Sequence, residues 1–403
     1  MMKVNKLTLG LAAVGLVSLP VMMQAEEKMS QLQTALSSTT ISGYVDTSAQ
    51  WQIGSAKGGT PPGYAFNDKN KQDGFNLNVV NLTIEKPLDA QDQWAAGYKI
   101  ETIYGPNAMG WNYSANQSFP GYNYKFSEVA IKQAYVALRA PVGNGIDMKI
   151  GTFDSIVGYE SFNAGSNPNY TRSWGYTIEP TEHTGLLASY QVCKEFGIAA
   201  GVANTVNSGI NSRSFLVSTR SETDKTYMGG VTLTAPESMG FLAGSTLYGA
   251  VVSGFNSGVL GAGNDHTINY YAGLTLNTPV KGLKVGLAYD HLGNEQGLGA
   301  VGTVAGNKYN INAGSMYLSY QATEKLSFHG RGEYVWTDLP HLGSSQGYAS
   351  EMVAVTGTIQ YDLWANVLSR LEVRWDHAMD GQYAFNAADR NALMVAANII
   401  YKF

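Results

Sequence analysis

Apolar and polar side chains alternate along most of the chain with the two-residue period of a β-strand. In the first such segment, residues 41–53, odd positions are mostly apolar and even positions carry polar groups. The last segment, 393–403, alternates in the same way and ends on Phe403. A terminal strand of this kind is typical of outer-membrane barrels, although alone it also fits the edge of a soluble β-sandwich. The pattern predicts sixteen strands: 41–53, 75–86, 93–104, 128–140, 145–153, 184–192, 195–204, 226–235, 240–254, 266–277, 282–291, 309–320, 325–336, 351–361, 366–376 and 391–403.

Short and long connections alternate strictly between these strands. With an even strand count, this alternation predicts an all-β fold, a transmembrane antiparallel up-and-down barrel whose two ends meet on the periplasmic side. Apolar parity switches at Val79 and Val80 and again between Ile131 and Val136, which predicts a β-bulge or a misplaced boundary in each strand. The predicted turns cover 86–92, 141–145, 235–239, 278–281, 322–324 and 362–365, and the predicted extracellular loops cover 54–74, 105–127, 154–183, 205–225, 292–308, 337–350 and 377–390.

The N-terminus has the features of a cleaved secretory signal. Lys3 and Lys6 precede an apolar stretch over 7–23, and Ala25 suits a cleavage site. We therefore expect a signal peptide at 1–25, a short periplasmic segment at 26–40, which is either helical or an unstructured leader, and the barrel at 41–403. Export with such a barrel predicts localisation in the outer membrane.

Composition agrees with a barrel that has one face in lipid and one in water. Hydrophobic residues make up 44% of the chain and charged residues only 14%, whereas a soluble protein carries roughly a quarter charged residues. Without residues 1–25 the chain has 24 basic and 31 acidic residues, a balance of −7 that gives no sign of nucleic-acid binding. The single Cys193 forms no internal disulfide, and six scattered histidines lack metal-ligand spacing. We expect no metal and no cofactor.

Three stretches resemble the OmpL-like family of β-barrel porins: ISGYVDTSAQW from Ile41, KQAYVALRAPVGNGIDMKIGTFDSIVGYES from Lys132, and HTGLLASY from His183. Beyond about Tyr190 the likeness rests on strand layout and the terminal Phe403. The resemblance implies an outer-membrane porin, permits a homotrimer, and implies little about a particular solute. The expected partners are outer-membrane lipid, small hydrophilic solutes or ions, and the barrel-assembly machinery, which would bind the C-terminal strand.

Charged residues concentrate on the parity predicted to face inward. In a wide barrel such charges set up a transverse field that orients solutes, but they would equally serve only to solvate the lumen and pair across strands. Because both signs are present, we expect weak ion selectivity. The candidate pore-lining residues on strands are Lys99, Glu101, Arg139, Lys149, Arg331, Glu333, Arg370, Glu372, Arg374 and Asp376, and Asp147 shares their parity.

The predicted loop 154–183 differs from the others in carrying five aromatic residues beside charged ones. Exposing five aromatics to water is unfavourable, so we expect the loop to fold inward and narrow the pore. The alternative is a loop packed over the barrel mouth or against a partner subunit. Its candidate constriction residues are Glu160, Arg172, Glu179, Glu182 and His183.

Two apparent enzyme motifs are matches by chance. GSSQG at 343–347 fits a nucleophile elbow but lies in a glycine-rich loop, and GLGAVG at 297–302 lacks a βαβ unit. The sequence therefore favours a passive diffusion porin that is not an enzyme. Two other functions remain open: a closed or plugged barrel that acts as an adhesin or structural anchor, and an outer-membrane barrel hydrolase that would depend on Ser345.

Overall fold

The computed structural model describes residues 38–54, 61–89, 94–109, 128–206, 210, 213–214, 224–255, 266–294, 309–338, 350–380, 385 and 389–403. The predicted signal peptide, residues 26–37 of the predicted periplasmic segment and both discounted motifs lie outside these residues.

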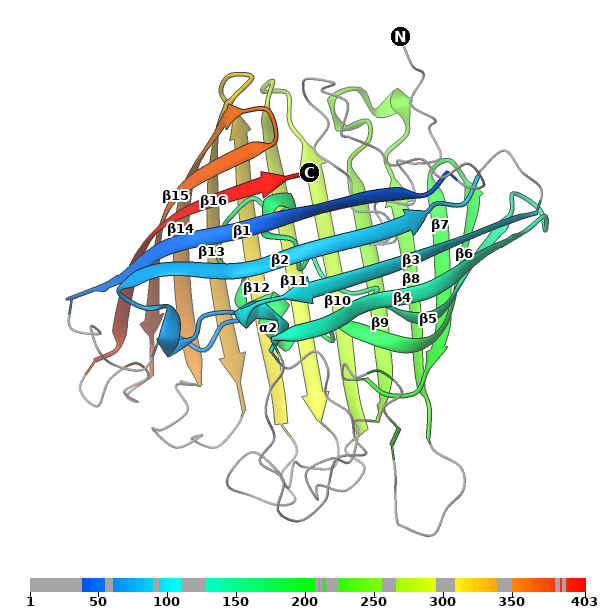
Figure 1. Cartoon of the computed structure of the whole chain (residues 1–403), viewed down its shortest axis with the longest axis horizontal. Helices are drawn as coiled ribbons and strands as arrows, with labels where there is room; N and C mark the ends of the chain where they lie inside the picture. The colour runs from blue at the N-terminus through cyan, green and yellow to red at the C-terminus, as the bar shows by residue number, and fades with distance from the viewer. Residues whose placement is uncertain are drawn as a thin grey trace.

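Within the described residues the chain forms a closed antiparallel barrel of sixteen strands, in which each strand pairs with its neighbours in sequence (Figure 1). The predicted fold class and strand number are confirmed. The strands are β1 (Thr40–Ile53), β2 (Gly74–Lys86), β3 (Ala95–Tyr104), β4 (Val129–Ala140), β5 (Ile146–Asp154), β6 (Glu182–Cys193), β7 (Phe196–Ala203), β8 (Thr226–Thr234), β9 (Thr246–Phe255), β10 (His266–Asn277), β11 (Leu283–Asn294), β12 (Tyr309–Gln321), β13 (Leu326–Thr337), β14 (Glu351–Trp364), β15 (Val367–Ala378) and β16 (Asn391–Lys402).

The first and last strands close the barrel. They pair from Tyr44 opposite Lys402 to Ile53 opposite Leu393. Gly43 and Phe403 exchange both main-chain hydrogen bonds, each at 2.9 Å, so pairing continues to the C-terminal residue. Because no strand edge remains unpaired at this seam, main-chain polar groups there need no water.

Alternation along β15 shows how the sequence selects the two faces. Leu371 and Val373 are exposed on the outer surface, 61% and 49% accessible. Their neighbours Glu372 and Arg374 are buried on the opposite face. Since successive side chains of a strand point to opposite sides, the outer face is apolar and suited to acyl chains, while the charges lie inside.

Both parity switches in the sequence are β-bulges. Between β1 and β2, Asp46 pairs with Val79 and Thr47 pairs with Leu77, which leaves Asn78 as the extra residue. Between β3 and β4 the register shifts in the same way and leaves Lys132 as the extra residue. Asn78 and Lys132 are both buried. Each bulge therefore turns one polar side chain away from the lipid-facing surface.

Three strand boundaries predicted from the sequence are wrong. β11 continues to Asn294 and β14 continues to Trp364, each past its predicted end. The strand predicted at 240–254 begins only at Thr246, because the preceding turn is longer than expected and contains the 3₁₀ helix η5 (Glu237–Leu242). Gly240 and Gly244 have positive φ angles of 61° and 78°, which end any extended strand there.

Helical segments are few and short. They are η2 (Lys69–Lys71), η3 (Pro106–Ala108), η4 (Ala164–Ser166), α2 (Trp174–Ile178) and η5. Among the described residues, no helix has the length and apolarity needed to cross a membrane.

Candidate functional site: the loop between β5 and β6

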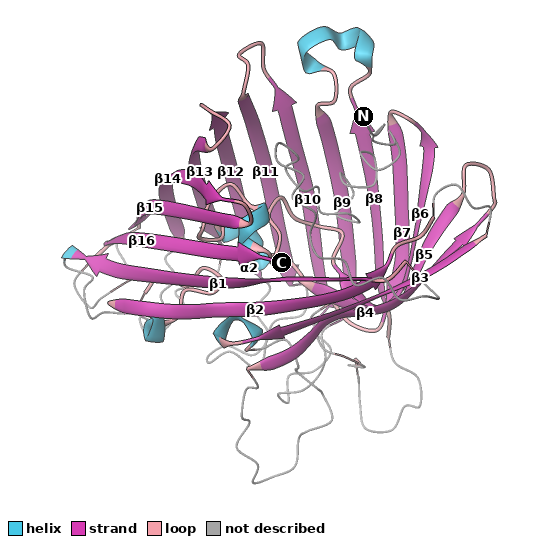
Figure 2. Cartoon of the chain, turned by 45° about the horizontal axis from the view of Figure 1, so that its top comes forward, coloured by secondary structure: helices cyan, strands magenta, loops and turns pink. Residues whose placement is uncertain are grey.

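Residues 155–181 connect β5 to β6 and contain η4 and α2. In Figure 2, α2 lies within the ring of strands. Ser173 begins this helix because its hydroxyl accepts the main-chain N–H of Tyr176 at 3.0 Å, and α2 packs against β11 and β12. The loop also contacts the polar face of β13, β14 and β15, and those contacts define the candidate site.

Carboxylates of the barrel wall accept the main-chain N–H groups of the loop. Glu372 on β15 accepts from Tyr170 at 2.6 Å and from Thr171 at 2.9 Å. Glu333 on β13 accepts from Trp174 at 2.7 Å. These bonds let an extended loop segment lie buried without a paired strand, since its main-chain donors are satisfied by charged acceptors.

Arginines of the same wall donate to the carbonyl oxygens of the loop. Arg331 on β13 donates to Thr171 at 2.7 Å, and Arg374 on β15 donates to Arg172 at 2.6 Å. Arg370 on β15 reaches farther back along the loop and donates to Ala164 at 2.7 Å. The wall therefore binds both kinds of main-chain group over one stretch of the loop.

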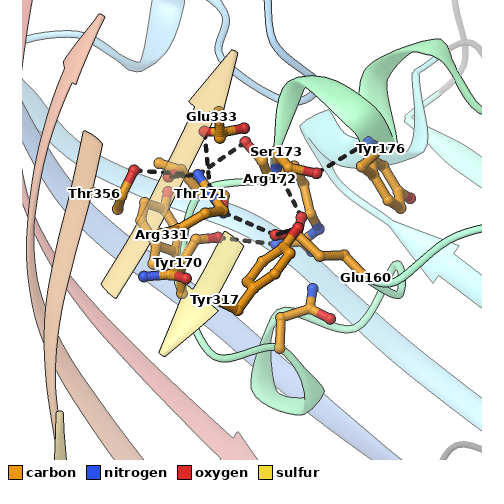
Figure 3. A network of polar contacts seen from close by, with 12 residues as sticks. Glu160, Tyr170, Thr171, Arg172, Ser173, Tyr176, Tyr317, Arg331, Glu333 and Thr356 are labelled. Carbon is orange, nitrogen blue, oxygen red and sulfur yellow. Dashed lines mark hydrogen bonds and ion pairs between the residues drawn. The ribbon is translucent and has the colours of Figure 1, made fainter. Parts of the chain in front are cut away.

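The loop also contributes a charged side chain, Glu160, to its contacts with this wall. Glu160 accepts from Arg331 at 2.8 Å, from the hydroxyl of Tyr317 at 3.1 Å and from the main-chain N–H of Ser173 at 2.7 Å (Figure 3). Arg331 also contacts Glu333 at 3.0 Å. All these charged side chains are buried. A buried charge is tolerated only while its partners remain, so removal of one member costs roughly 3–5 kcal/mol.

A second loop joins the first. The connection between β1 and β2 brings Tyr64 edge-on to Trp174, with ring centroids 6.1 Å apart, and Arg374 lies 3.6 Å over the Tyr64 ring. The main-chain N–H of Ala65 donates to Thr177 at 2.9 Å. Tyr64 gives no periodic signal in the sequence because it lies in a long loop, although an aromatic residue directly after Pro61, Pro62 and Gly63 is visible there.

Charged residues on β3, β4 and β5 form a second group, on strands that do not neighbour β13 or β15 in the barrel. Glu101 on β3 lies 3.5 Å from Lys99 and 3.8 Å from Lys132. Lys132 also contacts Asp154 at 2.5 Å. Lys149 on β5 lies 4.8 Å over the ring of Tyr135. The ion pairs of this group join Glu101 and Asp154 to lysines of β3 and β4.

The remaining candidate residues are placed apart from these two groups. Arg139 pairs with Asp147 at 2.8 Å beside the turn between β4 and β5. His183 on β6 is buried against Ser155 at 3.0 Å, and Glu182, also on β6, is buried next to it in sequence.

Arg172 belongs to the loop itself. It donates to the carbonyl oxygens of Tyr170 at 2.9 Å and of Phe162 at 2.5 Å. These bonds hold two parts of the same loop together.

Glu179 follows α2 and is half-buried. Burial raises the pKa of this carboxyl well above its usual value, and the neighbouring Asp290 carboxyl on β11 raises the pKa further. The raised pKa favours the protonated form of Glu179, in which like-charge repulsion with Asp290 is absent.

In the part of the chain that the structure describes, no three His, Cys, Asp or Glu side chains gather in a way that could hold a metal ion. What the arrangement offers is a loop fixed across the polar interior by charged wall residues, which is suited to shaping a passage.

Known structures share this architecture. The outer-membrane channel DcaP of Acinetobacter baumannii superposes with a TM-score of 0.59 at 11% identity, covering 93% of this chain and 100% of that one. An anion-selective porin from Comamonas acidovorans gives 0.57 at 13%, covering 91% and 99%. The trimer form of OmpT, an outer-membrane protein of Vibrio cholerae, gives 0.51 at 10%, covering 91% and 99%. At these identities the likeness shows the fold alone.

Sequence comparison identifies the family. No curated protein matches this chain. The model of the family described as "Putative beta-barrel porin-2, OmpL-like" matches residues 38–403, which is the entire predicted barrel. The closed sixteen-strand barrel agrees with this match, and the chain belongs to the OmpL-like family of outer-membrane β-barrel porins.

Proposed function

We propose that the protein is a passive diffusion porin for small hydrophilic solutes or ions, with the loop between β5 and β6 as its constriction. The observation that carries this proposal is the attachment of Tyr170, Thr171 and Trp174 to the carboxylates of β13 and β15. A loop bonded through its main chain keeps one position while solutes pass. A loop held only by apolar side chains would slide more easily.

The charge pairing supports weak ion selectivity. Around the loop, the basic Arg331 and Arg374 are matched by Glu333 and Asp376 at 2.8 to 3.5 Å. Because neighbouring opposite charges cancel over a short distance, little net field remains to exclude one sign of ion. The net charge of the whole chain is −5, which is small for its length.

Three further parts of the proposal rest on the family, on a neighbour in trimer form and on the N-terminal sequence. The protein acts as a homotrimer in the outer membrane, the assembly machinery binds the strand that ends at Phe403, and residues 1–25 are removed on export. The named trimer form of OmpT supports the first part only by its fold.

Polymer exclusion in a planar bilayer tests the proposed constriction. Single-channel conductance is recorded while polyethylene glycols of increasing size are added, and the smallest excluded polymer gives the limiting diameter. We expect exclusion of all but the smallest polymers, because the loop crosses the interior. Free entry of large polymers would show a wide lumen and refute the constriction. Absence of any conductance would favour the closed adhesin or anchor.

A chemical cross-link between loop and wall tests the loop position independently. Asn169 donates to Thr358 on β14 at 2.7 Å, so cysteines at both positions, in a Cys193→Ser background, lie within reach of a short bifunctional thiol reagent. We expect the cross-linked variant to conduct like the untreated one, since the loop already occupies that place. Failure to cross-link, or a large fall in conductance after cross-linking, would contradict this loop position.

A further inference from the structure

Residues 61–72, in the connection between β1 and β2, reach beyond their own two strands. Near the start of this segment, Tyr64 is buried in one apolar cluster with Val335, which lies close to the end of β13. Near its other end, Lys71 donates to the side chain of Asn107 in η3, between β3 and β4. Because β13 and β4 lie on opposite sides of β1 in the barrel, the segment extends along the wall in both directions.

The segment lies closer to the end of the barrel than the loop between β5 and β6. Both follow odd-numbered strands of an antiparallel barrel, so both leave the wall at the same end. Along β15 the loop is bound at Arg370, Glu372 and Arg374. Tyr64 lies over Arg374 and shares its apolar cluster with Ala378, the last residue of that strand. A solute that enters beside this wall therefore meets the segment before it meets the loop.

Aromatic contacts join the segment to the loop beneath it. Phe66 packs edge-on against Phe162 with ring centroids 5.5 Å apart, and its ring centroid lies 5.9 Å from that of Tyr176. The guanidinium of Arg172 lies 5.4 Å from the centroid of the same ring. Phe66 therefore contacts three side chains of the loop at once.

The backbone at Phe66 opposes this attachment. Its φ angle is 65°, in the left-handed region that is unfavourable for an aromatic residue. Such a conformation persists only where surrounding contacts enforce it. Withdrawal of the segment would let Phe66 return to an ordinary conformation. The contacts of the ring and the strain of the backbone therefore act in opposite directions, which suits a segment that detaches and reattaches.

The loop is attached to the wall more strongly than the segment is attached to the loop. The main-chain N–H groups of Tyr170, Thr171 and Trp174 donate to buried carboxylates. Between segment and loop, the main-chain N–H of Ala65 donates to the neutral hydroxyl of Thr177 at 2.9 Å. Hydrogen bonds to charged groups are roughly twice as strong as neutral ones. We therefore expect the segment to separate from the loop while the loop stays on the wall.

We propose that residues 61–72 form a lid that closes the passage by packing on the constriction loop, and that Phe66 holds this lid closed. The inference rests on the proposed function, because it assigns a regulation to the same passage. Since the constriction loop keeps its position when the lid withdraws, the lid sets the fraction of time that the channel is open. The size of the open current depends on the constriction loop instead.

Single-channel recording of Phe66→Ala tests the role of the ring. We expect the ratio of open to closed time to rise about ten-fold, because two ring contacts and a cation–π contact are lost. The open current should keep its wild-type size. Phe241→Ala is the matched control, since Phe241 is exposed in the turn that contains η5. An unchanged open fraction in Phe66→Ala, or an open current of different size, would overturn the lid.

A cross-link between lid and loop tests closure directly, and it remains decisive if Phe66→Ala fails to fold. Cysteines at Ala65 and Thr177, in a Cys193→Ser background, lie within reach of a short bifunctional thiol reagent. We expect the current to disappear after cross-linking. The pair at Asn169 and Thr358 is the control, because it ties the loop to the wall and leaves the lid free. A current that survives the link between Ala65 and Thr177 would overturn the lid.

Hydrogen exchange of the full-length mature protein in detergent separates the two proposals, because it needs no current. Phe66→Ala should speed exchange in the peptide that contains Ala65 about ten-fold, since exchange follows the population of the open lid. Exchange at Tyr170, Thr171 and Trp174 should stay slow. Faster exchange at Ala65 with no current in a bilayer would keep the lid and refute the porin. A current together with unchanged exchange at Ala65 would keep the porin and refute the lid.

Discussion

Arg331 on β13 and Glu160 in the loop between β5 and β6 form an ion pair at 2.8 Å across 171 residues of sequence, and neither side chain has any exposure to solvent. This pair fixes the loop to a wall that it meets only in the folded barrel. The same arginine binds the carbonyl oxygen of Thr171, so a single side chain holds two points of the loop.

Loss of Arg331 should release the loop. In Arg331→Met, Glu160 loses its cationic partner inside a buried cluster and Glu333 keeps only Arg374, at 3.5 Å. This loss costs roughly 3–5 kcal/mol of loop attachment. We expect larger and noisier single-channel conductance than in the wild type, measured in the same salt. Arg139→Met is the control, because Arg139 pairs with Asp147 beside a turn and touches neither Glu160 nor Thr171. Equal conductance of wild type and Arg331→Met would contradict the anchoring role.

Packing of β5 against β4 should not tolerate a side chain at Gly151. Gly151 has a φ of 135°, and a Cβ built there lies 2.3 Å from the carbonyl oxygen of Ala134. We expect Gly151→Ala to destabilise the barrel by about 1–3 kcal/mol, seen as a lower temperature of the folded-to-unfolded band shift on a gel. Gly330→Ala on β13, where nothing lies within 4 Å, should leave that temperature unchanged.

Glu179 should make the attachment of α2 depend on pH. Because burial and Asp290 raise its pKa in the folded state, the native protein keeps a proton that the unfolded chain releases. Stability is then fully present at low pH and falls as pH rises from the ordinary glutamate range toward the raised value. Glu179→Gln, which mimics the protonated form, should flatten this dependence in thermal unfolding and stabilise the protein at neutral pH. Glu324→Gln, at an exposed turn, should retain the wild-type slope.

Much of the barrel was predictable because alternation has a direct physical cause. On β15, exposed Leu371 and buried Arg370 follow from the two faces of one strand. The bulges at Asn78 and Lys132 were visible as changes of parity. Parity could not show that β9 begins as late as Thr246, since apolar residues such as Phe241 also occur in the glycine-rich turn before it.

The site was less predictable. Parity indicated which face Glu372 occupies, but it carries no information that Glu372 accepts the main-chain N–H of Tyr170, 202 residues away. The expectation that the loop narrows the pore remains a proposal for conductance measurements. Tyr64 was missed because an aromatic residue in a loop looks ordinary in sequence, and only the folded loops bring its ring to 6.1 Å from that of Trp174.

Purified mature protein in a planar lipid bilayer, recorded over a graded series of salt concentrations, tests the central claim most directly. A water-filled passage predicts stepwise single-channel currents whose size rises with bulk salt, with a reversal potential that reflects weak ion preference. Correctly folded protein that inserts and yet gives no discrete currents at any salt concentration would contradict the porin.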